Sequence, residues 1–180
     1  IKPGITEREI FVLDRNIGNQ DSGFSAQNTY EEVVKALTKA INNGNTLEDI
    51  ALHLNLESTT MLYRHIYIRD NLDITLHKFI RYGSSEEYKN DKKAIFIGFQ
   101  MANELSRVPK NQQNRVYKFI VKNKLKGWNE IKSVRELLER TNLNINEIFE
   151  KVLSESGKSD RSYSHTIPIN LEDDSPELFK

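Results

Sequence analysis

Apolar side chains recur every three or four residues along most of this chain, which is the spacing that places them on one face of an α-helix. The first clear run covers 29–43 and ends at Gly44, a residue type that commonly stops a helix. We therefore predict an all-α fold, a multi-helix array. The same spacing predicts further helices at 72–82, 92–106, 111–124, 129–140 and 144–154.

The two ends of the chain lack this pattern. Residues 1–28 are polar and broken by proline and glycine, and their short apolar run at 10–13 fits either a strand or a helical turn. The other end is polar and acidic, with the run Glu172-Asp173-Asp174. We expect flexible N- and C-terminal segments. The predicted division is a mostly irregular, extended segment at 1–28, a helical domain at 29–154 and an acidic, disordered tail at 155–180.

Residues 46–68 carry the pattern of a helix-turn-helix. Thr46 and Asp49 stand three residues apart, as in a capping box, at the start of a short helix that we expect at 47–54. Ala51 is the small residue that such a motif needs where the second helix crosses the first.

Asn55 follows this helix and is one of the few residue types that tolerate the left-handed backbone of a tight turn. Ser58 is placed to cap the second helix, which we expect to end near Ile68. The apolar residues expected to hold the two helices together are Ile50, Leu54, Leu56, Leu62, Ile66 and Ile68.

The formal charge of zero is the sum of segments with opposite sign. Residues 1–60 hold 5 Lys/Arg and 9 Asp/Glu, residues 61–135 hold 16 and 7, and residues 136–180 hold 5 and 10. The middle of the chain is therefore basic. This asymmetry predicts a local surface for a polyanion, although solvated helix faces rich in lysine would give the same counts.

Three consecutive segments resemble the DNA-binding part of ParB/KorB-type partition proteins. Residues 49–56, 62–68 and 72–83 are similar to that family's Ile-Ala helix with its turn, its recognition helix and a helix that ends in glycine. The resemblance covers roughly residues 27 to 140 and rests on pattern, without an invariant catalytic string. Similar positions downstream are Ala94, Ala102, Leu105, Gln112, Gln113, Ile120, Val134 and Arg135.

Two features depart from the family pattern. The turn between Ala51 and Leu62 is one residue longer than usual, and Asn55 replaces the common turn glycine. The chain also has nothing similar to the Arg-rich nucleotide-binding motif of the family's N-terminal domain, so CTP binding is not implied and we expect no cofactor. Because the sequence begins with Ile, a domain preceding it is left open.

The resemblance implies sequence-specific binding of double-stranded DNA, with the second helix in the major groove. Thr59, Thr60 and Tyr63 are expected to approach bases, while Ser58 contacts phosphate and Arg64 reads guanine or clamps the backbone. Tyr67 is expected either to contact DNA or to pack against its neighbours. The expected phosphate-contacting rim consists of Arg69, Lys78, Arg81, Lys89, Lys92 and Lys93.

The family resemblance also implies a role in plasmid or chromosome partition or in transcription regulation. It implies a homodimer on two-fold related half-sites and, for partition, a partner ATPase. Two other interpretations stay open. One is a helical protein-interaction module with an architectural helix-turn-helix; binding of structured RNA is less favoured, because a helix cannot read the narrow major groove of A-form RNA.

Other chemistry finds little support in the sequence. The sequence has no cysteine, so we expect no disulfides. No two of His53, His65 and His77 are three or four residues apart, the spacing that would place them on one helix face, so we expect no metal site. No Gly-rich phosphate loop and no Ser-His-Asp grouping is evident, so we expect no catalytic residues and no enzyme activity. No stretch approaches the roughly 18 apolar residues of a membrane span. We expect a cytoplasmic protein, associated with nucleoid or plasmid.

Overall fold

Helices make up most of the computed structural model, which describes residues 7–18, 28–83, 85–125 and 127–156. Within these ranges the strands are limited to one pair of two residues each. The predicted all-α class is therefore confirmed. The predicted acidic tail lies outside the described residues from position 157 onward.

The N-terminal region contains helix where we predicted irregular chain. α1 (Glu7–Leu13) continues directly into one turn of π-helix, η1 (Asp14–Gly18). Leu13 and Ile17 bury their side chains here, and α1 packs against α2. The prediction is wrong over these residues because the short apolar run at 10–13 gains its partners only when it meets the next helix. Residues 1–6 and 19–27 lie outside the described part.

α2 (Tyr30–Asn42) confirms the first predicted helix. Thr29 and Glu32 form a capping box, in which each backbone N–H donates to the other residue's side chain. The chain leaves the helix through Gly44, whose φ of 82° is a conformation that favours glycine. α3 (Leu47–His53) and α4 (Thr60–Asn71) follow.

The middle of the chain differs from the two helices predicted at 72–82 and 92–106. Only α5 (Ile74–His77), α6 (Glu86–Lys89) and α7 (Phe99–Leu105) are helical there. β1 (Ile80–Arg81) and β2 (Ile97–Gly98) pair in parallel, with Ile80 opposite Ile97. Both isoleucines are fully buried. The apolar spacing of each segment was compatible with a helix, but two β-branched residues that meet across the fold are also well suited to a strand pair.

The remaining predicted helices are confirmed as α8 (Lys110–Lys122), α9 (Asn129–Arg140) and α10 (Ile145–Glu155). The rings of Phe119 and Phe149 stack with centroids 4.1 Å apart and join α8 to α10. Arg135 on α9 lies 3.6 Å from the Glu104 carboxylate on α7, which ties this end to the middle of the molecule.

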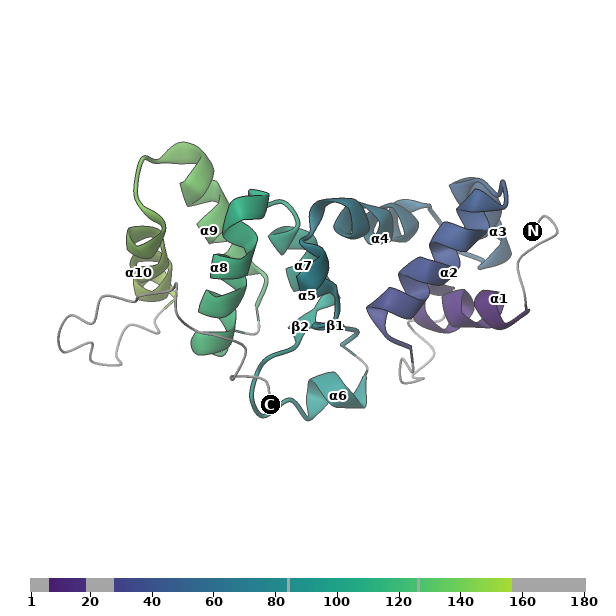
Figure 1. Ribbon diagram of the computed structural model, residues 1–180, viewed down its shortest axis with the longest axis horizontal. Coiled ribbons are helices and arrows are strands. Elements are labelled where there is room, and N and C mark those ends of the chain that lie inside the picture. Colours follow the sequence, from purple (N-terminus) through teal and green to yellow (C-terminus); the bar gives the residue numbers. More distant parts are fainter. Residues whose placement is uncertain (1–6, 19–27, 84, 126, 157–180) are drawn as a thin grey trace.

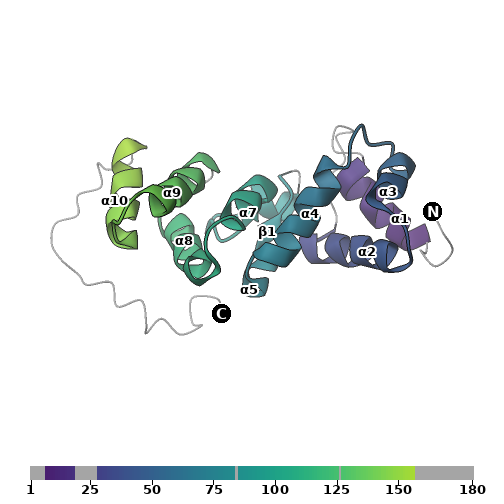
Figure 2. The same ribbon diagram turned by 90° about the horizontal axis from the view of Figure 1, so that it is seen from above.

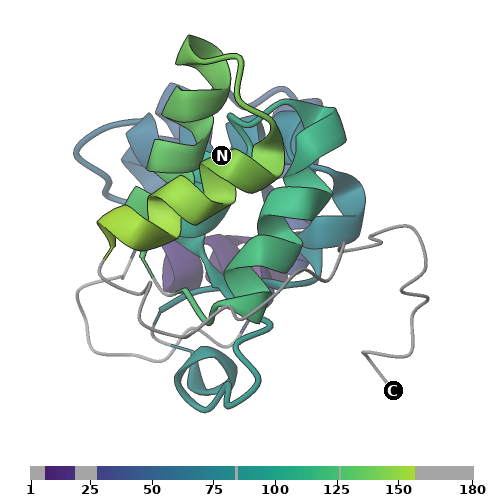
Figure 3. The ribbon, with the colours of Figure 1, turned by 90° about the vertical axis from the view of Figure 1, so that its left-hand side faces the viewer.

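The helices form an elongated body (Figure 1). α1, α2 and α3 lie at one end and α9 and α10 at the other, while α4 follows the upper edge. α6 projects from the lower edge of the molecule. Figure 3, viewed from the α10 end, shows the same projection. In the view from above, α3 and α4 are in plain sight (Figure 2). No helix among the described residues is long and apolar enough to cross a membrane.

Candidate nucleic-acid interface

α3 begins with a reciprocal cap and ends in a tight turn. The Thr46 hydroxyl accepts from the Asp49 N–H at 3.0 Å, and the Asp49 carboxylate accepts from the Thr46 N–H at 2.9 Å. Asn55 has a φ of 52°, and the Leu56 N–H donates to the Ala51 carbonyl at 2.9 Å, closing the turn. Ala51 is buried against the rest of the motif. The predicted cap, small residue and turn are confirmed.

α4 starts and ends later than the second helix that we predicted. Ser58 lies before the N-cap position, which is Thr59, and its Oγ is 3.4 Å from the Thr60 N–H. This N–H donates to the Ser58 hydroxyl, which in turn donates to Thr60 Oγ1 at 3.1 Å, so Ser58 supplies the side-chain cap of the helix as predicted, although Thr59 occupies the N-cap position and makes no side-chain cap bond. The helix passes Ile68 and ends at Asn71, because the backbone of Leu72 is extended (φ −80°, ψ 142°); the Leu72 side chain is buried.

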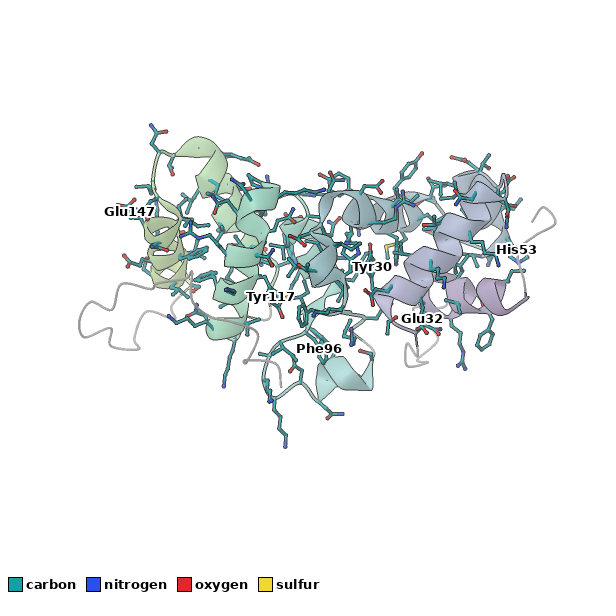
Figure 4. The ribbon with its side chains drawn as sticks, viewed as in Figure 1. Tyr30, Glu32, His53, Phe96, Tyr117 and Glu147 are labelled. Atoms are coloured by element: carbon teal, nitrogen blue, oxygen red, sulfur yellow. The ribbon has the colours of Figure 1, made fainter. Side chains whose placement is uncertain are left out.

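The inner face of α4 includes a histidine that the apolar pattern missed. Leu62 and Ile68 are fully buried as predicted, whereas Ile66 is only partly buried and His65 is fully buried. His65 packs beside the ring of Tyr30, which Figure 4 labels near the middle of the molecule, and lies 4.4 Å from the Phe99 ring centroid. Burial lowers the pKa of His65 to about 4, so the ring is neutral near pH 7.

The outer face of α4 is polar and aromatic. Tyr63 and Tyr67 are 56% and 43% exposed, and Thr60 is exposed beside them. Arg64 is half-buried in the same stripe. An open depression of about 460 Å³ runs along this stripe, and Asn103 and Arg107 at the end of α7 form part of its other side.

Arg69 was predicted to contact DNA phosphates, but its guanidinium is hydrogen-bonded within the protein. Its Nη1 donates to the Thr38 hydroxyl at 2.9 Å, and its Nε and Nη2 donate to the Asp70 carboxylate at 2.7 and 3.1 Å. These bonds raise the pKa of Arg69 and lower that of Asp70. Arg69 therefore joins α4 to α2, and its guanidinium charge is already paired.

Lys78 follows α5 directly, and Arg81 belongs to β1. The Lys78 side chain is exposed, with Nζ 5.0 Å from the Phe79 ring centroid. Arg81 donates to two backbone carbonyls, of Lys78 and Ile80, and its guanidinium lies over the Phe96 ring at 4.2 Å. These contacts hold Arg81 along the strand pair.

Lys89, Lys92 and Lys93 are exposed on α6 and the loop that follows it. α6 lies at the lower edge of the molecule, opposite α4 (Figure 1). The structure therefore does not bring these three lysines together with Tyr63 and Arg64 into one continuous surface.

Further basic residues beside α4 come from a segment that the sequence pattern did not single out. Residues 105–129 contain 7 Lys/Arg and no Asp/Glu, a signal that could have been read from the sequence. Arg107 lines the depression beside α4, and Lys110 Nζ lies 3.3 Å from the Asp70 carbonyl at the end of α4. Lys118 and Lys122 are exposed further along α8.

The three histidines considered for a metal site are not gathered together. His53 is exposed on α3 at one end of the molecule (Figure 4), while His65 and His77 are buried around Tyr30. In the described part of the chain, no three His, Cys, Asp or Glu residues could hold a metal ion together.

Comparison of the chain with protein-family models, with curated proteins and with solved structures gives no match in any of the three.

Proposed function

We propose that this chain binds double-stranded DNA in a sequence-specific manner, with α4 as the recognition helix in the major groove. The observation that carries this proposal is the arrangement of α4 after α3 and the tight turn at Asn55: its inner face is anchored in the core, and its outer face presents Tyr63 and Tyr67 to solvent. A rigid helix with an exposed polar face has the width that the major groove of B-DNA admits.

The residues on α4 suit the two tasks of a DNA-binding helix. Thr60 and Tyr63, near its N-terminus, can reach base edges, and Thr59 on the preceding turn lies beside them. Arg64 lines the depression together with Thr60 and Tyr63, and its guanidinium can donate to guanine or to a phosphate. Ser58 is exposed before the helix and is placed for a phosphate contact.

Charge for this surface comes from neighbouring elements. Arg69 is paired with Asp70, so α4 itself contributes mainly Arg64. Arg107 and Lys110 add positive charge beside the C-terminal half of α4, from the start of the acid-free segment at 105–129. Electrostatic attraction of the DNA backbone would then arise next to the reading helix, as phosphate binding requires.

The biological role that fits this activity is plasmid or chromosome partition, or transcription regulation by occupation of a specific site. This part of the proposal rests on the resemblance to ParB/KorB-type proteins. It would place the protein on the nucleoid or on a plasmid, as a homodimer on two-fold related half-sites, with a partition ATPase as partner in the first case.

The test is fluorescence anisotropy of a labelled pool of duplexes, titrated with wild-type protein and with Arg64→Glu protein across a salt series. Lys151→Glu, an exposed charge reversal on α10, serves as a matched control. We expect salt-dependent binding that Arg64→Glu abolishes and Lys151→Glu retains. Selection of preferred sites from the pool would then establish sequence specificity.

The alternative function is a helical protein-interaction module in which α3 and α4 are architectural. Absence of duplex binding by wild-type protein at low salt would favour this alternative. Equal loss of binding in the Arg64 and Lys151 variants would instead indicate nonspecific attraction and would contradict the role given to α4.

A further inference from the structure

We propose that the depression beside α4 binds one phosphate of the DNA backbone through Asn103, Arg107 and Arg64. The inference rests on the proposed function, since the phosphate belongs to the DNA that α4 reads. It adds two residues outside the helix-turn-helix, Asn103 on α7 and Arg107 after it, which no motif in the sequence indicated.

Asn103 is the observation that points to a ligand. Its side chain lines the depression, yet the residue is only 5% exposed. Within the described part of the chain, its amide group forms no hydrogen bond, although its backbone carbonyl accepts from Ser106. The amide is not fully enclosed by protein atoms and opens on the depression, so a ligand there can reach it. An anion that enters the depression would provide a hydrogen-bond partner, because the Nδ2 group is a hydrogen-bond donor.

Arg107 retains free donors toward the depression. Its side chain is 46% exposed, and the ion pair that it forms among the described residues, with Glu104 Oε1, spans 3.5 Å. The same Glu104 carboxylate also lies 3.6 Å from Arg135 Nε, so its negative charge is shared between two guanidinium groups. Arg107 therefore remains available for a second anion, and a guanidinium can present two parallel N–H donors to a phosphate.

Arg64 adds the second positive charge from the α4 side. Its Nη1 makes a weak contact with the Met61 sulfur at 3.9 Å. Asp70 also lines the depression and would repel a phosphate, but both of its carboxylate oxygens accept from Arg69. The local balance therefore favours an anion.

The shape of the site favours a phosphate over a base. A phosphate projects from the DNA backbone and can enter a concave site, whereas base edges lie on the floor of the groove and are read by side chains that protrude. Asn103 is too deeply buried to protrude, while Tyr63 and Tyr67 on the rim do so. Inorganic phosphate has the same chemistry, and the experiment must separate it from DNA.

The experiment measures duplex affinity across a salt series for wild-type protein, Arg107→Gln, Asn103→Asp and a control, Lys151→Gln. Arg107→Gln removes one exposed charge, as the control does, and Asn103→Asp is nearly isosteric but replaces the donor by a carboxylate. We expect about tenfold weaker binding in each of the first two variants and a salt slope smaller by about one for Arg107→Gln. Circular dichroism checks that every variant is folded.

Each outcome decides the inference. Weaker binding with an unchanged sequence preference supports a backbone phosphate, and a changed preference overturns it in favour of base reading. Wild-type affinity in both variants overturns the phosphate site and leaves the proposed function standing. If inorganic phosphate competes at matched ionic strength while both variants bind duplex normally, the site takes a free anion and the inference fails. No duplex binding by wild-type protein removes the proposed function as well.

Discussion

The Tyr82 hydroxyl lies 3.1 Å from Nε2 of His65, so a hydrogen bond as well as apolar packing anchors the second helix of the motif to the core. On the other side of the ring, Nδ1 lies 2.7 Å from the Met61 carbonyl, which can only accept. Nδ1 therefore carries the proton, and the Tyr82 hydroxyl donates to Nε2. The neutral ring satisfies both of its nitrogens inside the core.

This arrangement makes stability depend on pH. Burial lowers the pKa of His65 from 6.5 to about 4, so the stability due to the neutral ring is complete above pH 6.5 and is lost as the pH falls toward 4. The loss amounts to roughly 3 kcal/mol. In urea unfolding, wild-type protein should lose more stability than His65→Gln protein over this range. All other ionisable groups are the same in the two proteins, so equal losses would contradict the prediction.

Gln113 should be among the side chains that matter most for the position of α4. It is fully buried on α8, its Oε1 accepts from the Asp73 N–H at 2.7 Å, and its Nε2 donates to the carbonyls of Asn71 and Val108, each at 2.9 Å. Gln113→Leu would leave these three backbone groups without a partner, at a cost of about 3 kcal/mol. Chemical denaturation measures this. The control is Asn111→Leu, at an exposed position on the same helix. If both substitutions lowered the unfolding free energy by a similar small amount, the three hydrogen bonds of Gln113 would be dispensable.

The turn between α3 and α4 should tolerate glycine better than alanine. Asn55 has a φ of 52°, which costs alanine about 1 kcal/mol more than glycine. We therefore expect Asn55→Ala to lower the unfolding free energy by about this amount relative to Asn55→Gly, as measured by thermal or urea unfolding. The reverse order of stability would show that the turn relaxes into another conformation.

Charge reversal at Arg64 and at Arg69 should have different effects: the first should weaken DNA binding, and the second should lower the stability of the fold. Arg69→Glu removes the hydrogen bond to Thr38 and opposes Asp70, so it should destabilise the protein by about 1 to 3 kcal/mol. Arg64→Glu breaks no strong contact and should leave the melting temperature near that of wild-type protein while weakening DNA binding. Differential scanning fluorimetry and anisotropy on the same samples test the pair. A binding loss in Arg69→Glu alone would reverse the assignment.

Short sequence patterns predicted correctly those features that depend on a few neighbouring residues. The capping box of Thr46 and Asp49, the left-handed turn at Asn55 and the amphipathic helices α2, α8, α9 and α10 follow from short-range hydrogen bonds and from the 3.6-residue period. Each of these features depends on residues that are close together in the sequence, so the sequence pattern predicts it directly.

Pairing between distant segments decided the rest. Ile80 and Ile97 become a strand pair because they meet in the core, and His65 becomes a core residue because Tyr82 and Met61 satisfy its nitrogens. The depression exists because the end of α7 lies beside α4, about 40 residues away in sequence. The sequence by itself determined the long amphipathic helices α2, α8, α9 and α10, the capping box of α3 and the basic middle of the chain. Only the tertiary structure decided which basic side chains lie beside α4, because electrostatic and hydrogen-bond interactions depend on the distance between groups in space and not on their separation in sequence.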